Sequence, residues 1–490
     1  MSEVIMKSTK VKNLLKILPR IMKIYALYAL IFGVVIFGLC RHNSSKYFEI
    51  NSVERFLGNE ICQDKVALVE GRFESGIVRI NLIENAQETL DISYYTIQEG
   101  VSTNIFLACI LEAADRGVQV RFILDGLFHN LRGELKDVIY AFAEHPNIEL
   151  KFYEPFSLLK PWTWNNRLHD KIIVVDEHLV IIGGRNIGDK YFAQGEYDDN
   201  YDGITVDDRD VVIVNTDRQN SSGSVVSQVK NYFNYVWNHE YSKYSLTKLT
   251  QHKQDKGHKK AKSLSNYLAA LKNTNPDLFN NHIDWLEVSI PTSKVTLIHN
   301  PIQRLNKEPW CWYEITNLMK SANDSIIIQS PYVIPTKDML KYLNGKNNSP
   351  EEISILTNSI ACSPNPLAIS GYSLYREKIV DYGAKLYEFQ GPNSIHAKSF
   401  IFDNRISLVG SFNFDSRSTF LSTETMVVID SAEFAKLLKH EIKNQISNCL
   451  LVGKDCSYIN NSEVTENVSP FKSIIIKILS AITYCFNYML

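Results

Sequence analysis

Two stretches of this chain carry the same arrangement of polar residues. RLHDKIIVVDEHLVIIGGRN spans residues 167–186, and SIHAKSFIFDNRISLVGSFN spans residues 394–413, 227 residues further along. In each stretch a lysine follows a histidine by two residues, an aspartate follows the lysine by five, and an asparagine follows the histidine by 17. This repeat distance is far longer than one solenoid unit. The duplication therefore predicts two homologous lobes rather than a repeat array.

The segments ahead of each motif predict strands alternating with helices. Residues 89–97, 118–126, 325–334 and 351–359 predict strands, and residues 106–117 and 312–324 predict helices. Alternation of this kind is typical of α/β units built around a sheet with parallel strands. The expected fold is therefore α/β, with two lobes of mixed, mainly parallel sheets flanked by helices. The two lobes are expected to form one active site.

The chain of 490 residues is long enough for two or three domains. Composition and pattern divide it into the following expected regions: a basic N-terminus at 1–23, an apolar helix at 24–40, a first lobe at 44–214, a polar linker or insertion at 215–284, a second lobe at 285–455, and an apolar C-terminal segment at 470–490.

The uncharged apolar run at 24–40 is long enough to cross the hydrocarbon core of a membrane as a helix. Six basic residues precede it, and such a flank predicts a cytoplasmic N-terminus with both lobes on the other side of the membrane. A buried core helix and a cleaved signal peptide are the alternatives. The segment at 470–490 contains two lysines, which favours either an interfacial helix or a helix packed on the protein's own core.

Each motif predicts a β-hairpin with its polar groups gathered at one edge. Alternation along a strand places His169 and Lys171 on one face, and the return strand brings Asn186 back beside them. Asp176 has the opposite parity and falls at the turn, so we expect it to act through structure. The second motif repeats this arrangement with His396, Lys398, Asp403 and Asn413 in the corresponding positions.

This combination of residue types suits phosphoryl chemistry. Lysine and asparagine donate to non-bridging phosphate oxygens, where negative charge must be stabilised in the transition state. Histidine can act as a nucleophile or as a general acid near neutral pH. One histidine cannot act on both sides of a phosphorus atom, whereas two facing lobes can supply one to each side. With both lysines in the site, we expect the reaction to need no metal or other cofactor.

A nucleophilic histidine also needs a carboxylate that fixes the orientation of its ring. Glu424 lies 28 residues after the second histidine, just ahead of a predicted strand. Aligning that strand with residues 209–214 places Asp208 opposite it, in an acidic segment where a plain turn residue is the alternative. We therefore predict Glu424, and also Asp208, as orienting residues. The net charge of −2 gives no basic signature of a nucleic-acid partner.

The pattern H-x-K-x4-D-x6-G-[G/S]-x-N, present twice, resembles the hallmark of the phospholipase D superfamily. The stretches GGRNIGDKYF, QSPYVIP, ILTNSIA, GYSLYR and GSFNFDSRSTFLSTE are similar to those of bacterial cardiolipin synthases. The resemblance implies a metal-independent phosphohistidine, with His169 as nucleophile and His396 as acid. It implies a membrane enzyme, in a bacterial inner membrane, that joins phosphatidyl groups to the alcohol of a second phospholipid. The implied substrates are phosphatidylglycerol, phosphatidylethanolamine or cardiolipin.

The chain departs from that family at residues 360–372, where an aspartate and a histidine are usual, and this leaves the choice of acceptor open. It also has one predicted span where other cardiolipin synthases have two. A hydrolytic phospholipase D that releases phosphatidic acid is therefore an alternative. A nuclease or other phosphodiesterase and a catalytically inactive scaffold are further alternatives, which the near-neutral charge and the complete pair of motifs disfavour.

Overall fold

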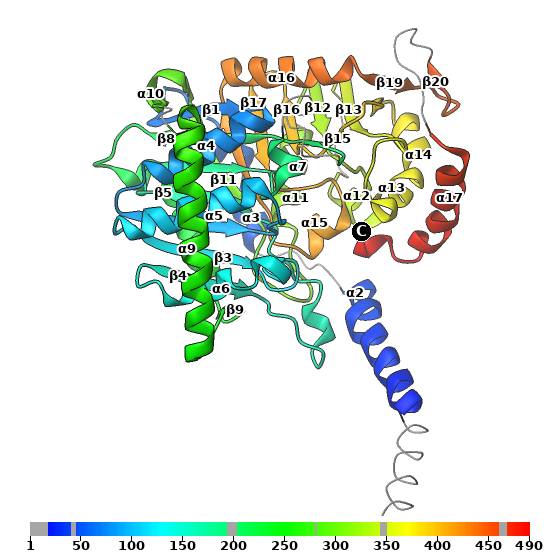
Figure 1. Cartoon of the computed structure of the whole chain (residues 1–490). Helices are drawn as coiled ribbons and strands as arrows, with labels where there is room; N and C mark the ends of the chain where they lie inside the picture. Colours follow the sequence, from blue (N-terminus) through cyan, green and yellow to red (C-terminus); the bar gives the residue numbers. More distant parts are fainter. Residues whose placement is uncertain (1–17, 41–45, 194–202, 280–281, 344–349, 460–467) are drawn as a thin grey trace, which may run out of the picture.

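Two extended β-sheets form the body of the protein, which we describe from a computed structural model (Figure 1). The structure describes residues 18–40, 46–193, 203–279, 282–343, 350–459 and 468–490. The expected basic N-terminus therefore lies mostly outside the described residues. Within them, the duplication seen in the sequence reappears as two sheets of matching strand order.

The first sheet has nine strands in the part of the chain described. Their order across the sheet is β10 (Ile290–Pro291), β1 (Asp64–Val69), β8 (Asp210–Asn215), β6 (Leu179–Gly183), β5 (Lys171–Val175), β2 (Thr89–Tyr94), β3 (Gln119–Asp125), β4 (Ile148–Tyr153) and β9 (Ser242–Tyr244).

The second sheet, over the same described ranges, also has nine strands. Their order is β11 (Lys294–His299), β18 (Thr425–Asp430), β17 (Ile406–Gly410), β16 (Ser399–Phe402), β12 (Ser325–Gln329), β13 (Glu352–Asn358), β14 (Lys385–Phe389), β19 (Cys449–Val452) and β20 (Tyr458–Ile459). From β1 to β9 and from β11 to β19 the two orders correspond strand for strand, so the prediction of two homologous lobes is confirmed.

Parallel pairing is concentrated in one part of each sheet. Strands β2, β3 and β4 are parallel neighbours, as are β12, β13 and β14. The other neighbouring pairs are antiparallel, because each motif forms a hairpin whose return strand runs back along its partner. The mixed α/β fold class is confirmed, with a smaller share of parallel pairs than the mainly parallel sheets expected.

Helices flank both sheets. The helices of the first lobe are α4 (Arg72–Glu84), α5 (Val101–Asp115), α6 (Val138–Glu144), α7 (Asp189–Phe192), α8 (Val225–Asn238), α9 (Gln251–Thr274) and α10 (Trp285–Val288). Those of the second lobe are α11 (Trp310–Ser321), α12 (Lys337–Leu340), α13 (Pro366–Ser373), α14 (Arg376–Asp381), α15 (Ser416–Phe420), α16 (Ala432–Ile446) and α17 (Pro470–Tyr484). Two of these helices, α8 and α16, lie between the sheets and contact both.

The central core joins the two lobes. Side chains from the inner faces of both sheets pack there with the apolar faces of α8 and α16. Ile182 of β6 and Val211 of β8 belong to the same cluster as Val409 of β17 and Val427 of β18. These four residues are fully buried aliphatic side chains, each of which contributes about 1.5–3 kcal/mol on burial. The lobes are therefore held together over the strands that carry the motifs.

The expected polar linker at 215–284 is part of the first lobe instead. Helix α8 buries seven side chains at helical spacing, including Phe233 and Trp237, and β9 pairs with β4 at the sheet edge. Helix α9 is polar because it packs on α5 and α6 through only a narrow face. A Cβ at Gly257 of α9 would lie 2.8 Å from the carbonyl carbon of Tyr140, so the close approach requires glycine. The boundary expected at 284/285 also moves, since β10 pairs with β1 and the second sheet begins at β11.

One helix in the described part of the chain, Leu18–Gly38, is long and apolar enough to cross a membrane. It begins before the predicted 24–40 run, and an 18-residue window within it has a mean hydropathy of 2.1, with 11% of that window buried. Its C-terminal part contacts the loop after β4, where Asn165 Nδ2 donates to Gly33 O at 2.7 Å. Tyr25 and Tyr28 also donate to Leu158 O and Leu159 O of that loop, and Figure 1 shows the helix pointing away from the two sheets.

The C-terminal segment packs on the second lobe. Helix α17 lies against α13, and Ser480 Oγ donates to Ser370 O at 3.0 Å. Lys472 Nζ donates to Ala361 O at 2.8 Å, so α17 also contacts the 360–372 segment where the chain departs from the cardiolipin synthases. The other face of α17 carries exposed apolar side chains, among them Ile474, Ile478 and Ile482. The helix thus has one face on the protein's own core and one apolar face exposed.

Both predicted motif hairpins are present. The β5–β6 hairpin turns at Asp176, whose carboxylate accepts hydrogen bonds from the backbone N–H groups of Gln87, Glu88 and Thr89 at 2.8–2.9 Å. Asp403 makes the corresponding contacts to residues 323–325 at the β16–β17 turn. The φ angles of Asp176 and Asp403 are +48° and +50°, so both residues adopt the left-handed backbone conformation. Each aspartate ties its hairpin to the start of the neighbouring strand.

Replacing either aspartate with alanine is expected to lower the free energy of unfolding. Asp176→Ala and Asp403→Ala each remove the acceptor of three backbone hydrogen bonds, which costs about 1–3 kcal/mol. Chemical denaturation of the purified variants measures this loss. Asp381→Ala, at an exposed position of the second lobe where no backbone hydrogen bond to the carboxylate is present among the described residues, is the matched control. An unfolding midpoint equal to that of the parent protein in both motif variants would contradict the structural role.

Candidate active site

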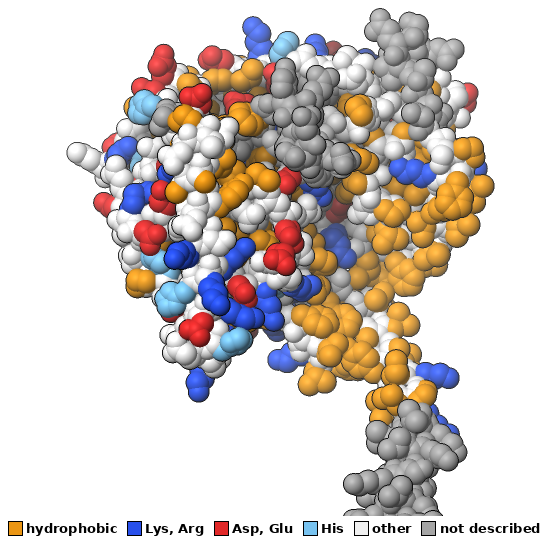
Figure 2. All heavy atoms as spheres, in the orientation of Figure 1, with side chains coloured by type: hydrophobic (Ala, Val, Ile, Leu, Met, Phe, Trp, Pro, Cys, Tyr) orange, Lys and Arg blue, Asp and Glu red, His pale blue; other side chains and the backbone are white. Residues whose placement is uncertain are grey.

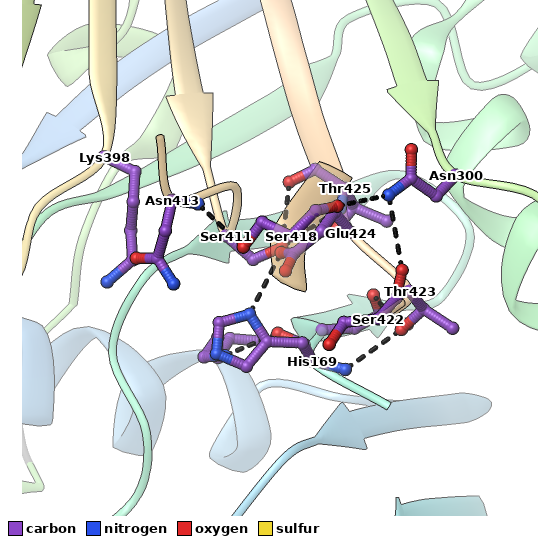
Figure 3. Close-up of polar contacts among 12 residues, drawn as sticks. His169, Asn300, Lys398, Ser411, Asn413, Ser418, Ser422, Thr423, Glu424 and Thr425 are labelled. Atoms are coloured by element: carbon purple, nitrogen blue, oxygen red, sulfur yellow. Dashed lines mark hydrogen bonds and ion pairs between the residues drawn. The ribbon is translucent and has the colours of Figure 1, made fainter. Parts of the chain in front are cut away.

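Each motif histidine is paired with a carboxylate from the other lobe. His169 lies just before β5 of the first lobe, and its Nδ1 is 3.0 Å from Oε2 of Glu424, which lies just before β18 of the second (Figure 3). His396 of the second lobe has its Nδ1 2.5 Å from Oδ2 of Asp208, ahead of β8 of the first. Both carboxylate side chains are fully buried. The two predicted orienting residues are thus both beside a histidine, in a crossed arrangement that the sequence did not indicate.

Backbone contacts fix the same crossing. The His169 N–H donates to Thr423 Oγ1 at 2.9 Å, and the Thr423 N–H donates to Arg167 O at 2.8 Å. In the other half, the His396 N–H donates to Asp207 O at 2.6 Å. The residue ahead of each carboxylate therefore holds the main chain of the opposite histidine. This places the four side chains of the two pairs in one site between the lobes.

The two lysines lie in the same site. Lys171 and Lys398 are each buried, and each donates to the carbonyl oxygen of the histidine in its own motif. The charge of Lys398 lowers the pKa of His169 as well as that of His396, after the larger effect of burial. The charge of Lys171 acts on both histidines in the same way. Positive charge from both lobes therefore acts on the same two histidines.

The two motif asparagines direct polar atoms toward the site that contains the histidines and lysines. Lys398 and Asn413 lie side by side, with their side chains extending in one direction (Figure 3). The side-chain oxygens of Asn186 and Asn413 are buried, and neither has a hydrogen-bond partner among the described residues. Buried amide groups normally have partners, so matched exceptions in both motifs are the expected feature of groups that contact a substrate.

The small-residue pair of each motif makes room for the carboxylates. A Cβ at Gly184 would lie 2.1 Å from Asp208 Oδ1, so only glycine fits there. The corresponding residue of the second motif is Ser411, whose Oγ donates to Glu424 Oε2 at 2.5 Å (Figure 3). The glycine–serine difference between the motifs thus follows the aspartate–glutamate difference between their carboxylates.

Asp176 and Asp403 belong to the two motifs but lie away from the histidines. Their carboxylates bind backbone N–H groups at the hairpin turns, at the opposite end of the motif strands from the histidines. The physical reason is distance along the strand, since each aspartate follows its histidine by seven residues and so reaches the far end of the strand. The odd spacing also turns its side chain to the opposite face. Their contacts are those of structural residues, which is the role expected from their place in the motifs.

Sequence reasoning missed several groups that surround the histidines. The Tyr95 ring packs edge-on against His169 with centroids 5.0 Å apart, and the Tyr191 ring packs against His396 at 5.9 Å. The positive charge of Arg417 contributes to the lowered pKa of His169. Tyr95 directly follows β2 and Tyr191 lies in α7, and a single aromatic residue at either kind of position is common and gives no specific signal. Arg417 follows the second motif by four residues, where the first motif has Lys190.

Burial and charge set the protonation of the site. Burial lowers the pKa of His396 to about 3, that of Lys171 to about 7, and that of Lys398 to about 8. Burial also raises the pKa of Glu424 to about 8. The pKa of Asp208 moves the other way, because the charges of Lys398 and His396 outweigh the effect of its burial. One histidine thus faces a firmly ionised carboxylate, and the other faces one whose charge is disfavoured.

The chain is similar in sequence to known proteins. Residues 79–237 and 315–446 match the family described as "Cardiolipin synthase, PLD-like domain". The chain is 30% identical over 417 residues to cardiolipin synthase C of Escherichia coli K12, covering 77% of this chain and 84% of that protein. It is 26% identical over 376 residues to cardiolipin synthase 1 of Staphylococcus epidermidis RP62A, covering 76% and 66% of the two chains.

A solved structure shares the fold. The crystal structure of phosphatidylserine synthase from Haemophilus influenzae Rd KW20 superposes with a TM-score of 0.57 at 16% identity, covering 90% of this chain and all of that one. The protein belongs to the phospholipase D superfamily, within its cardiolipin-synthase-type family. The resemblance seen in the sequence is confirmed.

The lysine pKa values predict the pH dependence of catalysis. A lysine is charged below its pKa, so the site loses positive charge as pH rises through about 7 for Lys171 and about 8 for Lys398. We expect kcat/KM, which reports the free enzyme, to fall over this interval. In Lys171→Arg the fall should begin at higher pH, because a guanidinium stays charged. Lys398→Arg, which keeps Lys171, is the control. A parent rate that is constant or rising between pH 7 and about 9 would contradict the assignment.

Proposed function

We propose that this protein is a membrane phosphatidyltransferase of the cardiolipin-synthase type that works through a phosphohistidine. It transfers the phosphatidyl group of one phospholipid to an alcohol group of a second. The observation that carries the proposal is the crossed pair His169–Glu424 and His396–Asp208, with a lysine and an asparagine beside each histidine. This set provides a nucleophile, an acid and phosphate donors from opposite lobes.

The first step forms the covalent intermediate. Nε2 of neutral His169 attacks the phosphorus of the donor phosphodiester, and the bond to the leaving alcohol breaks. His396, protonated, gives its proton to the leaving oxygen. Lys171, Lys398 and the two motif asparagines bind the non-bridging oxygens, where developing charge is stabilised. The second step reverses these roles, as neutral His396 takes the proton of the acceptor alcohol and the phosphorus–nitrogen bond breaks.

The two carboxylates support the assignment of roles. A general acid must become an imidazolium, and an ionised carboxylate such as Asp208 stabilises that form of His396. The Glu424 carboxyl has a raised pKa, and His169 has a pKa well below its usual value, so the uncharged nucleophile is favoured. A bound phosphodiester anion opposes the charge of the lysines and raises the pKa of His396 toward the range in which it can donate a proton.

The membrane side of the proposal rests on the helix Leu18–Gly38 and its basic flank. By the positive-inside rule, the N-terminus lies in the cytoplasm and both lobes lie across the inner membrane from it. The proposed substrates are phospholipids, namely phosphatidylglycerol as donor and phosphatidylglycerol or phosphatidylethanolamine as acceptor. The names of the relatives support this substrate class, since two are cardiolipin synthases.

A trapping experiment tests the roles of the histidines. Phosphatidyl-4-nitrophenol has a leaving group that needs no acid, so His396→Ala is expected to accumulate a phosphatidyl-enzyme labelled from the lipid. His169→Ala is expected to accumulate none. Intact-protein mass spectrometry with peptide mapping measures the adduct. The assignment would be reversed by an adduct on His396 in the His169→Ala protein, together with no adduct on His169 in the His396→Ala protein.

Product analysis tests the reaction itself. Detergent-purified protein receives labelled phosphatidylglycerol, with and without phosphatidylethanolamine or a small alcohol, and His169→Ala serves as the inactive control. The expected main product is cardiolipin. Phosphatidic acid as the main product, despite available acceptor, would instead identify a hydrolytic phospholipase D. That result would direct attention to residues 360–372 as the path of water.

A further inference from the structure

A cavity of about 560 Å³ lies where the helix Leu18–Gly38 meets the second lobe. Phe37 and Gly38 at the end of that helix form one wall, and Tyr488 of the C-terminal segment contacts them. Helices α12, α14 and α15 contribute to the remaining walls. The volume lies within the range of about 300–1,000 Å³ typical of sites for one small-molecule ligand or headgroup.

Two kinds of side chain line this cavity. Phe37, Phe420 and Leu421 give it a buried apolar wall. Lysines of α12 and α14 lie at its exposed side. Lys341 is neutralised by Asp338, whose Oδ1 is 2.5 Å from its Nζ.

The cavity also has surplus positive charge. Arg304, another lining residue, is neutralised by Glu154, with 2.5 Å between Nε and Oε1. Lys337 and Lys378 also line the cavity, and no carboxylate pairs with either one within the described ranges. An anionic group is therefore the complement of this opening, and an apolar group is the complement of its interior.

The cavity is continuous with surfaces suited to lipid chains. It begins at the end of the apolar helix, and α17 beside it exposes Phe471, Ile474, Ile478 and Ile482. Figure 2 shows hydrophobic side chains gathered over α17 and along the apolar helix on this face. A ligand here has its polar end at the lysines and its apolar part along these surfaces. That is the form of a phospholipid at a membrane interface.

Helix α15 separates this cavity from the active site. Ser416 and Phe420 of α15 line the cavity, whereas Ser418 of the same helix faces the active site. Its Oγ accepts a hydrogen bond from the Asn413 N–H at 3.2 Å, within the second motif. One short helix therefore forms a wall of both sites.

We propose that this cavity binds an anionic phospholipid, distinct from the lipid at the histidines, through its phosphate at Lys337 and Lys378. The inference rests on the proposed function, because it makes the cavity a holding site for a lipid substrate next to the catalytic site. The headgroup and glycerol occupy the cavity, and the acyl chains lie along the apolar helix and α17.

The test compares charge reversal inside and outside the cavity. Lys337→Glu/Lys378→Glu changes both cavity lysines, and Lys259→Glu/Lys262→Glu changes two exposed lysines of α9 as the matched control. Both pairs are made in the His169→Ala protein, and native mass spectrometry counts phosphatidylglycerol retained in detergent. The cavity variant should retain at least one lipid fewer than the control. Equal retention in the two variants would overturn the proposal, as would full displacement of the lipid by an equal concentration of inorganic phosphate.

A kinetic arm separates this inference from the proposed function. With His169 restored, the cavity variant should show a KM for phosphatidylglycerol about tenfold above that of the control, equivalent to about 1.4 kcal/mol of binding. An unchanged KM would count against the cavity as a substrate site. Because the retention measurement needs no turnover, a parent protein that fails to convert phosphatidylglycerol would refute the proposed function and leave the binding result to stand alone.

Discussion

The structure of the active site depends on one constraint, which is that each histidine takes its orienting carboxylate from the opposite lobe. Glu424 and Asp208 are fully buried between the lobes, and each would be an uncompensated buried polar group without the histidine that the opposite lobe supplies. Neither lobe therefore contains a complete half of the site. The apolar core between the sheets, with Val211 and Val427 in one cluster, keeps the lobes in the register that this crossing requires. Packing and catalysis are linked at the same strands.

Other features follow from that crossing. The fully buried guanidinium of Arg209, next to Asp208, donates to Gln329 and Ser399 of the second lobe at 2.6 and 2.8 Å, so the segment that carries the carboxylate is itself held across the interface. The duplication is not an exact symmetry, however. The pair Gly184–Asp208 corresponds to Ser411–Glu424, and the two carboxyl groups have pKa values shifted in opposite directions. An approximately symmetric fold thus gives its two histidines different environments, as two different chemical roles require.

Much of this was predictable from the sequence because it depends on local periodicity. Alternation along the motif strands places histidine and lysine together, and the distance of seven residues from the histidine places Asp176 and Asp403 at the turns. Contacts between distant segments were not predictable in this way. Alignment of the halves identified Glu424 and Asp208, but which histidine each one meets depends on how the lobes pack. The error at 215–284 has a related cause, since a helix that buries only a narrow face, such as α9, has the composition of a linker.

The most direct test of the crossed arrangement is the tautomeric state of each histidine, measured by nuclear magnetic resonance on protein labelled with ¹⁵N at histidine. Spectra of His169→Ala and His396→Ala assign the two signals. In the parent protein, both rings should carry their proton on Nδ1, facing the carboxylates. Glu424→Gln should change the tautomer populations of His169 alone, and Asp208→Asn those of His396 alone. A response of each histidine to the carboxylate of its own lobe would contradict the account.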